Sequence, residues 1–207
     1  MPTRVIIFDV DGLLFNTDEV LFRELQKSLR LLDVEIDEAF YAHNKYDDCI
    51  YALNISEGQR QEVLRSLRSR YHTDAILEQV ELKSGVRETL ATLASQYKLA
   101  TGSGEEKEQI ERYLRRFDIG EYFSFIGHGT MVPGRKSNPA YFQTIADFYD
   151  VPLSHCLHVG DTEIDQQALH AGVPVAIIPT KYSKHITFDP RCHMLESIRE
   201  LPLLLRQ

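Results

Sequence analysis

A short stretch near the start of the chain, Arg4–Leu14, carries two acids directly after a run of apolar residues. The run Val5–Phe8 is rich in β-branched and aromatic side chains, which is typical of a strand buried on both faces. Asp9 ends the run, and Gly12 favours a turn. Open parallel sheets bind their ligands at the carboxyl ends of their strands, so Asp9 and Asp11 are predicted to lie where a ligand binds. A strand that ends in a polar turn is the alternative interpretation.

The composition limits the classes of protein to which this chain can belong. Its 207 residues, of which 43% are hydrophobic and 26% charged, suit a globular fold with a buried core. The net charge of −8 argues against nucleic acid or an anionic membrane as a partner. Three widely spaced cysteines favour buried thiols in a reducing cytoplasm, and no stretch has the length of a membrane span or the pattern of a signal peptide. We therefore expect a cytoplasmic protein, a monomer or homodimer, without nucleic-acid or membrane partners.

Residues 15–82 show helical periodicity and no strand pattern. Asn16–Glu19 and Ser56–Gln59 have the form of capping boxes, in which a polar side chain begins a helix and the residue three positions later supports it. A further helix is expected over 38–53. The segment is predicted to be an all-helical insertion, and the remainder to form one α/β domain from residues 1–14 and 83–207.

Strand and helix patterns alternate after residue 84. Short apolar runs that end at glycine or polar residues predict strands, and apolar residues at helical spacing lie between them. Asn138-Pro139 favours a helix start, because proline is well tolerated at the first helical position. The alternation predicts an α/β fold with a doubly wound, mostly parallel sheet. Beyond the first strand, strands are expected at 98–100, 123–126, 156–159 and 175–178.

Polar residues follow three of these strands and precede one helix, and in a doubly wound sheet they gather at one edge. Each also has an ordinary structural interpretation: Thr101 can simply end a strand, Ser103 can cap the following helix, and Lys136 can be a surface lysine. His155 and His158 form an HxxH pair that flanks the entry to a strand, which argues against a zinc site. The residues expected to converge are Asp9 and Asp11, Thr101 and Ser103, Lys136, and Asp161 and Asp165.

Four of these elements, in this order, resemble the motifs of the haloacid dehalogenase-like hydrolases. They are Asp9-Val10-Asp11-Gly12-Leu13-Leu14, Thr101, Lys136 and Gly160-Asp161-Thr162-Glu163-Ile164-Asp165. The resemblance extends from Arg4 to about Gly172. The helical insertion is similar to the small helical cap of the phosphatase branch, which includes β-phosphoglucomutase-like and phosphoglycolate phosphatase-like proteins. The family's lysine is usually followed directly by proline; the order here is Lys136-Ser137-Asn138-Pro139, which leaves Arg135 as a competitor.

The resemblance implies different roles for the two N-terminal acids. Asp9 would be the nucleophile that forms an aspartyl-phosphate, and Asp11 the acid that protonates the leaving oxygen and then activates water. A Mg²⁺ ion would bind Asp9, the backbone carbonyl of Asp11, and Asp161, because hard oxygen ligands suit this ion. Carboxylates two residues apart repel each other, and the cation would relieve that repulsion.

The resemblance also implies which groups hold the phosphate. Lys136 and the Thr101 hydroxyl would bind the phosphoryl oxygens, helped by backbone N–H groups of the turn that begins at Gly102. Asp165 would orient Lys136 or a metal-bound water. Candidate contacts to the rest of the substrate, for which a solvated turn is the alternative, are Asn16, His43 and Lys45.

The expected function is that of a Mg²⁺-dependent phosphatase that hydrolyses a small phosphorylated metabolite, such as a sugar phosphate or a nucleotide. Asp11 favours ester hydrolysis, because the dehalogenases of the family lack an acid at that position. A sugar phosphomutase is the first alternative, although such enzymes tend to have a histidine where this chain has Leu21. The second alternative is a phosphorylatable signalling or binding module without turnover.

Overall fold

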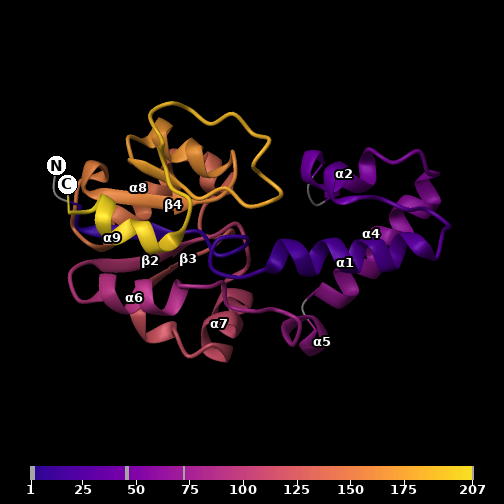
Figure 1. The fold of residues 1–207 in the computed structure, drawn as a ribbon, viewed down its shortest axis with the longest axis horizontal. Coiled ribbons are helices and arrows are strands. Elements are labelled where there is room, and N and C mark those ends of the chain that lie inside the picture. Colours follow the sequence, from indigo (N-terminus) through magenta and orange to yellow (C-terminus); the bar gives the residue numbers. More distant parts are fainter. Residues whose placement is uncertain (1–2, 45–46, 72, 207) are drawn as a thin grey trace. The chain divides into compact units, whose positions relative to one another are not determined.

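The computed structural model describes residues 3–44, 47–71 and 73–206. The chain divides into two compact units, which the sequence colours of Figure 1 distinguish. One unit comprises Met1–Phe15 and Leu82–Gln207, and the other comprises Asn16–Glu81. Across the described part of the chain, no helix combines the length and the apolar character that crossing a membrane requires.

The first unit is built on a six-stranded parallel sheet with the order β3-β2-β1-β4-β5-β6. The predicted doubly wound parallel sheet is confirmed. The register places Phe8 beside Thr101 on one side and beside Val159 on the other. The sequence did not indicate β6, because its two exposed residues carry no apolar periodicity. The strands are β1 (Val5–Phe8), β2 (Lys98–Gly102), β3 (Phe123–Gly127), β4 (Cys156–Gly160), β5 (Val175–Ile177) and β6 (His193–Met194).

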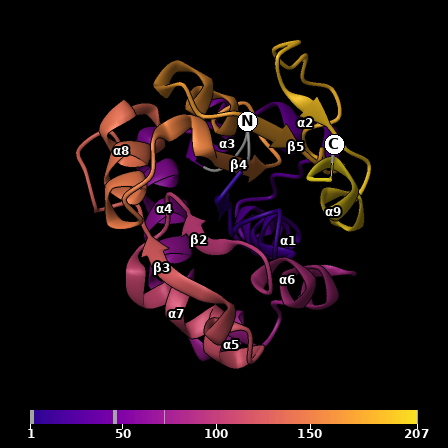
Figure 2. The same cartoon turned by 90° about the vertical axis from the view of Figure 1, so that its left-hand side faces the viewer.

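Helices cover both faces of this sheet. In Figure 2, α6 and α7 lie on one face and α8 on the other. Right-handed crossovers explain this arrangement, because the chain steps from β1 to β2 to β3 in one direction and then returns past β1 to β4. The helix α8 starts at Pro139, as the sequence predicts, and there the Asn138 side chain accepts a hydrogen bond from Ala140 N–H. The elements are α6 (Val86–Ala94), α7 (Lys107–Arg116), α8 (Pro139–Phe148), α9 (Leu201–Leu204) and the 3₁₀ turn Asp165–Ala171.

β1 is the centre of the core, and all four of its side chains are buried. Val5 and Ile7 belong to one apolar cluster with Tyr141 and Phe142 of α8. Consecutive strand residues point to opposite faces, so Ile6 and Phe8 serve the other face. The strand is therefore fixed by packing on both sides, and the backbone that follows it is held in a defined place.

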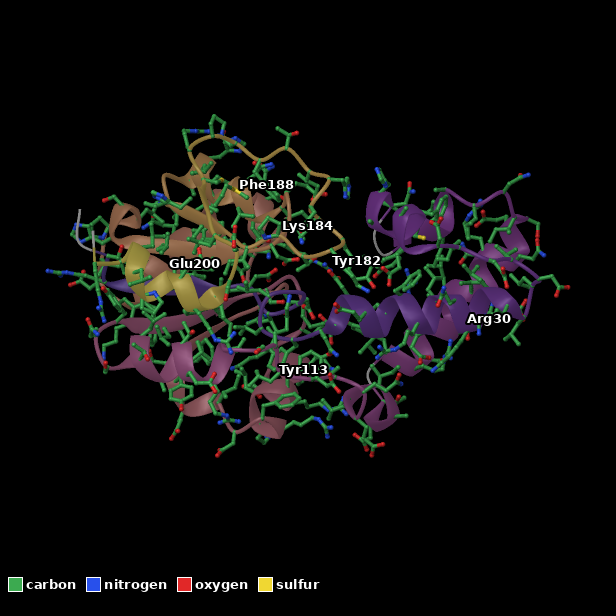
Figure 3. All side chains as sticks on the ribbon, in the orientation of Figure 1. Arg30, Tyr113, Tyr182, Lys184, Phe188 and Glu200 are labelled. Carbon is green, nitrogen blue, oxygen red and sulfur yellow. The ribbon has the colours of Figure 1, made fainter. Side chains whose placement is uncertain are left out.

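An aromatic cluster fixes the chain where the first unit is interrupted. The ring of Phe15 lies 5.3 Å from the rings of both Tyr113 (labelled in Figure 3) and Phe117, measured between centroids. Phe15 also forms a β-bridge with Leu82. Phe15, where the chain leaves the first unit, and Leu82, where it re-enters this unit, are thus bonded to each other.

The second unit is helical, as the sequence predicts. The capping box at Ser56 is confirmed, because Gln59 N–H donates to Ser56 Oγ and the Gln59 side chain accepts from Ser56 N–H. The single helix expected over 38–53 is wrong: α2 ends at His43, and Asn44 leaves helical geometry. The helices are α1 (Thr17–Arg30), α2 (Glu38–His43), α3 (Asp47–Tyr51), α4 (Glu57–Tyr71) and α5 (Asp74–Leu77).

The two ends of the helical unit are bonded to each other. Asn16 N–H donates to the Glu81 carbonyl at 3.1 Å, and Asn16 Oδ1 accepts from Glu81 N–H at 2.7 Å. The predicted capping box at Asn16 is wrong, because this side chain bonds to Glu81 and makes no capping hydrogen bond to α1. A local signal for a helix start was overridden by a contact with a residue far away in the sequence.

A buried acid joins α1 to α4 within the helical unit. Glu24 is almost fully buried and pairs with Lys27 at 2.6 Å and with Arg70 at 2.9 Å. The Gln79 side chain also donates to Glu24, at 3.3 Å, and the Arg70 guanidinium donates to the Ser28 hydroxyl. A buried carboxylate is tolerated only when it is paired in this way, so Arg70 should matter for stability.

We expect Arg70→Ala to lower the free energy of unfolding by about 1–2 kcal/mol, because it leaves Glu24 with fewer partners while the pair is still partly open to solvent. Urea denaturation followed by circular dichroism measures the effect. The matched control is Arg65→Ala, an exposed arginine on the same helix, which should change stability by less than about 0.5 kcal/mol. Equal losses in the two variants would contradict the role of Arg70.

Candidate active site

The carboxyl end of β1 places Asp9 and the turn that follows it. Asp9 N–H donates to the Val159 carbonyl of β4 at 2.8 Å, so the acid is tied to the neighbouring strand. Gly12 has a φ of 74°, in the region that favours glycine, and a Cβ there would lie 2.6 Å from Asp161 Oδ2. The turn can therefore pack against Asp161 only because position 12 has no side chain.

Lys136 reaches this strand end from the segment before α8. Its Nζ lies 2.9 Å from Asp9 Oδ1 and 2.7 Å from Asp165 Oδ1, and the side chain is buried. Gly134 and Arg135 both adopt positive φ, at 83° and 53°, just before it. The choice between Lys136 and Arg135 is thereby decided in geometry, because Arg135 is exposed while Lys136 lies between two buried acids.

Asp165 is bonded through both of its carboxylate oxygens. Oδ1 accepts from Lys136 Nζ and also lies 2.8 Å from His158 Nε2. Oδ2 accepts from the backbone N–H groups of Asp161 and Thr162 and from the Thr162 hydroxyl, at 2.9–3.1 Å. A Cβ at Gly160 would lie 2.1 Å from Asp165 Cγ, so this approach also requires glycine. Asp165 is consequently a fixed support for Lys136.

Three buried acids come close enough to share a metal ion. One oxygen from each of Asp9, Asp161 and Asp165 lies within 4.8 Å of the others. The oxygens of Asp165 are already accepting hydrogen bonds from the groups described above, so Asp9 and Asp161 are better suited to bind a cation directly. An all-oxygen donor set of this kind suits a hard divalent ion.

The hydroxyl that contacts Asp11 belongs to Ser103. Its Oγ donates to Asp11 Oδ2 at 3.2 Å and accepts from Glu105 N–H at 2.9 Å, and the residue is fully buried. The alternative of a helix cap does not hold, because α7 begins only at Lys107 and its N-cap is Glu106. Ser103 instead orients Asp11.

The prediction that the Thr101 hydroxyl serves the site is corrected by the structure. Thr101 lies beside Phe8 inside the sheet, and its hydroxyl donates to the Gly127 carbonyl at 3.0 Å. Gly102 is likewise part of β2, where a Cβ would lie 2.5 Å from Ile7 Cγ2. The strand simply runs further than the sequence indicated, so the residue that emerges at its end is Ser103.

Burial and charge shift the acid–base properties of these groups. Burial, followed by the negative charge of Asp165, raises the pKa of Asp9 to about 7, against the opposing effect of Lys136. Burial acts to lower the pKa of Lys136, but the two carboxylates outweigh it and raise that pKa above its ordinary value. Lys136 therefore remains an ammonium, whereas Asp9 needs a further cation to be fully ionised near neutral pH.

Two of the three candidate substrate contacts, Asn16 and His43, form hydrogen bonds within the helical unit. Asn16 bonds to Glu81, and His43 Nδ1 lies 2.8 Å from the Ala39 carbonyl on the same helix. Lys45 lies outside the described residues. These three assignments stay predictions. The residue that sequence reasoning missed is His158, which faces Asp165; a histidine inside the otherwise apolar run of β4 was the available signal.

Comparison with known proteins identifies relatives over most of the chain. The model of the family described as haloacid dehalogenase-like hydrolase matches residues 6–178. The pyrophosphatase PpaX of Listeria welshimeri is 24% identical over 216 residues, covering 97% of this chain and 95% of that protein. A phosphoglycolate phosphatase of Aquifex aeolicus is 26% identical over 189 residues, covering 87% of each. The solved structure of a predicted phosphoglycolate phosphatase from Haemophilus somnus has a TM-score of 0.82 at 22% identity, covering 99% of this chain and 98% of that one, and shares the fold.

We expect Asp9→Asn to stabilise the metal-free protein more at about pH 8 than at about pH 5. The pKa of Asp9 is raised from 3.8 to about 7, so its contribution to stability is present at low pH and is lost as pH rises through about 7. Asparagine removes the ionisation. Thermal melts in chelator at the two pH values measure the difference, with Asp150→Asn as an exposed control that tolerates the same change. A gain that does not depend on pH would contradict the shift.

Proposed function

The chain belongs to the haloacid dehalogenase-like hydrolase family, and on that premise we propose that it is a Mg²⁺-dependent phosphatase acting on a small phosphorylated metabolite. The observation that carries the proposal is the buried Lys136 ammonium between Asp9 and Asp165. This ammonium places a positive charge beside Asp9, the proposed nucleophile, where it would neutralise part of the negative charge of a bound phosphate group.

Asp9 attacks the phosphorus atom in the proposed first step. An oxygen of its carboxylate forms the new bond, and the bond from phosphorus to the leaving oxygen breaks. Asp11, held by the Ser103 hydroxyl, donates a proton to that leaving oxygen. In the second step Asp11 takes a proton from water, which attacks the aspartyl-phosphate and releases inorganic phosphate, so Asp9 and the protonated Asp11 are restored.

The remaining groups bind and neutralise the phosphate. Lys136 would contact the phosphoryl oxygens, while Asp165 keeps it in place. Ser103 replaces Thr101 as the hydroxyl of the site. A phosphoryl oxygen would compete with Asp11 for the hydrogen bond that the Ser103 hydroxyl donates. Asp9 and Asp161 would hold Mg²⁺, with the Asp11 carbonyl as the third expected ligand. When bound, the ion lowers the negative charge that an incoming phosphate meets.

The substrate class is proposed from the names of the relatives and from the topology. Pyrophosphate and phosphoglycolate are both small molecules with two acidic groups, so we propose a small, doubly anionic phosphate compound. The helical unit is inserted between β1 and α6, directly after the two acids, and would act as a cap that excludes water. Asn16, His43 and Lys45 are its proposed contacts. A cytoplasmic location and a monomeric or homodimeric state stay predictions.

The purified protein should release phosphate from a generic aryl phosphate in Mg²⁺ and lose this activity in chelator. Asp9→Asn should abolish turnover, because the nucleophile is gone, and Asp11→Asn should lower kcat by about 10²–10⁴. A panel of phosphorylated metabolites, assayed by phosphate release, identifies the substrate. Interconversion of sugar phosphates without phosphate release would favour the mutase, and a stable phosphoprotein without turnover would favour the signalling module. Full activity of Asp9→Asn would refute the assignment of the nucleophile.

The two hydroxyls form a matched pair of variants. Ser103→Ala should lower kcat by about ten- to a hundredfold, because Asp11 loses the donor that orients it. Thr101→Val should keep kcat within about twofold and cost about 1 kcal/mol of stability, since only a hydrogen bond to the Gly127 carbonyl is lost. Kinetics and urea denaturation of both variants decide between them. The reverse order of effects would restore Thr101 as the functional hydroxyl.

A further inference from the structure

His158 is a fully buried histidine in β4, behind the acids of the site. Its Nδ1 lies 3.1 Å from the Ile7 carbonyl oxygen, and its Nε2 lies 2.8 Å from Asp165 Oδ1. The ring of Phe142 packs against the imidazole in an edge-to-face arrangement, with centroids 5.1 Å apart. Both ring nitrogens are therefore engaged, and the imidazole is closed off from solvent.

Both oxygens that face the ring can only accept hydrogen bonds. A carbonyl oxygen has no proton. Burial acts to raise the pKa of Asp165, but the Lys136 charge and the hydrogen bond from His158 outweigh it and hold that pKa well below its ordinary value. A neutral imidazole has one N–H and one lone pair, so either tautomer would aim a lone pair at an oxygen. Only an imidazolium, with N–H groups on both nitrogens, satisfies the two contacts.

We propose that His158 is held as an imidazolium and acts as a positioning residue, fixing Asp165 and, through it, the Lys136 ammonium; its catalytic consequence rests on the proposed function. Asp165 Oδ1 is shared between His158 and Lys136, so Asp165 cannot turn to take a second N–H of Lys136. One Lys136 N–H points to Asp9, one to Asp165, and the third remains for a phosphoryl oxygen. Without the charge of His158, the hydrogen bond between Asp165 and Lys136 would become stronger, and the orientation of the Lys136 ammonium would be less well defined.

Nuclear magnetic resonance of the ring nitrogens tests the charge directly. The probe is the full-length, metal-free protein with ¹⁵N-labelled histidine, studied between about pH 6 and pH 8, and the His158 signals are assigned by their loss in His158→Gln or in His158→Asn. We expect both nitrogens in the range of protonated imidazole across this interval. One nitrogen in the range of a bare lone pair at about pH 7 would overturn the proposal.

Kinetics with an aryl phosphate and Mg²⁺ test the consequence for the site. His158→Gln can retain one donor but has no charge, and we expect kcat to fall on the order of tenfold, with KM within about twofold. His158→Leu, which has neither donor nor charge, should lose more. The control is His155→Gln, at the other histidine of the pair, which should leave kcat unchanged. Equal kcat in His158→Gln and the unchanged protein would overturn the positioning role.

The two experiments separate the failure of this inference from a failure of the proposed function. If the unchanged protein releases no phosphate from any compound tested, the proposed function fails. The ring-nitrogen signals still decide the charge of His158 in that case, because they need neither substrate nor metal ion.

Discussion

The contact on which the site depends is that of the buried Lys136 ammonium with Asp9 and Asp165. Three charges taken out of water are stable only if each is fully paired, and the surrounding structure supplies the pairs. Two successive left-handed residues turn Lys136 inward, and a glycine at position 160 lets the chain close over Asp165. Backbone N–H groups and His158 then supply the remaining hydrogen bonds of the Asp165 carboxylate. Few of these features can change alone without leaving a charge unpaired.

The parallel sheet converts distant sequence positions into neighbours. Asp9 follows β1, while Asp161 follows β4, which lies beside it, so about 150 residues of intervening chain separate groups that come within a few ångströms. The sequence predicted this convergence because apolar runs ending in polar residues mark the carboxyl ends of strands, and such ends share one edge. Given the strand order, the handedness of the crossovers then decides which face of the sheet each helix covers.

Sequence reasoning succeeded where a local pattern has one physical outcome and failed where register or distant contacts decide. The strands, the start of α8 and the inward lysine follow from apolar runs, from proline and from motif order. The end of β2 could not be predicted in this way, because apolar content does not show at which residue a strand leaves its sheet. The prediction therefore assigned the functional hydroxyl to Thr101, whereas the structure places Ser103 beside Asp11. Asn16 has the form of a helix cap, but its side chain bonds to a residue that local sequence does not reveal.

The bonds between Asn16 and Glu81 also bear on how the chain folds. Inserting a long segment into a domain normally raises the entropy lost when its flanking strands come together. Here the inserted unit joins its own two ends, and Phe15 and Leu82 form a bridge directly beside them. Once the helical unit has formed, its two ends lie next to each other, so for the first unit it is equivalent to a short turn between two adjacent residues. A domain interrupted after its first strand can then assemble its sheet with the contact order of a nearly uninterrupted chain.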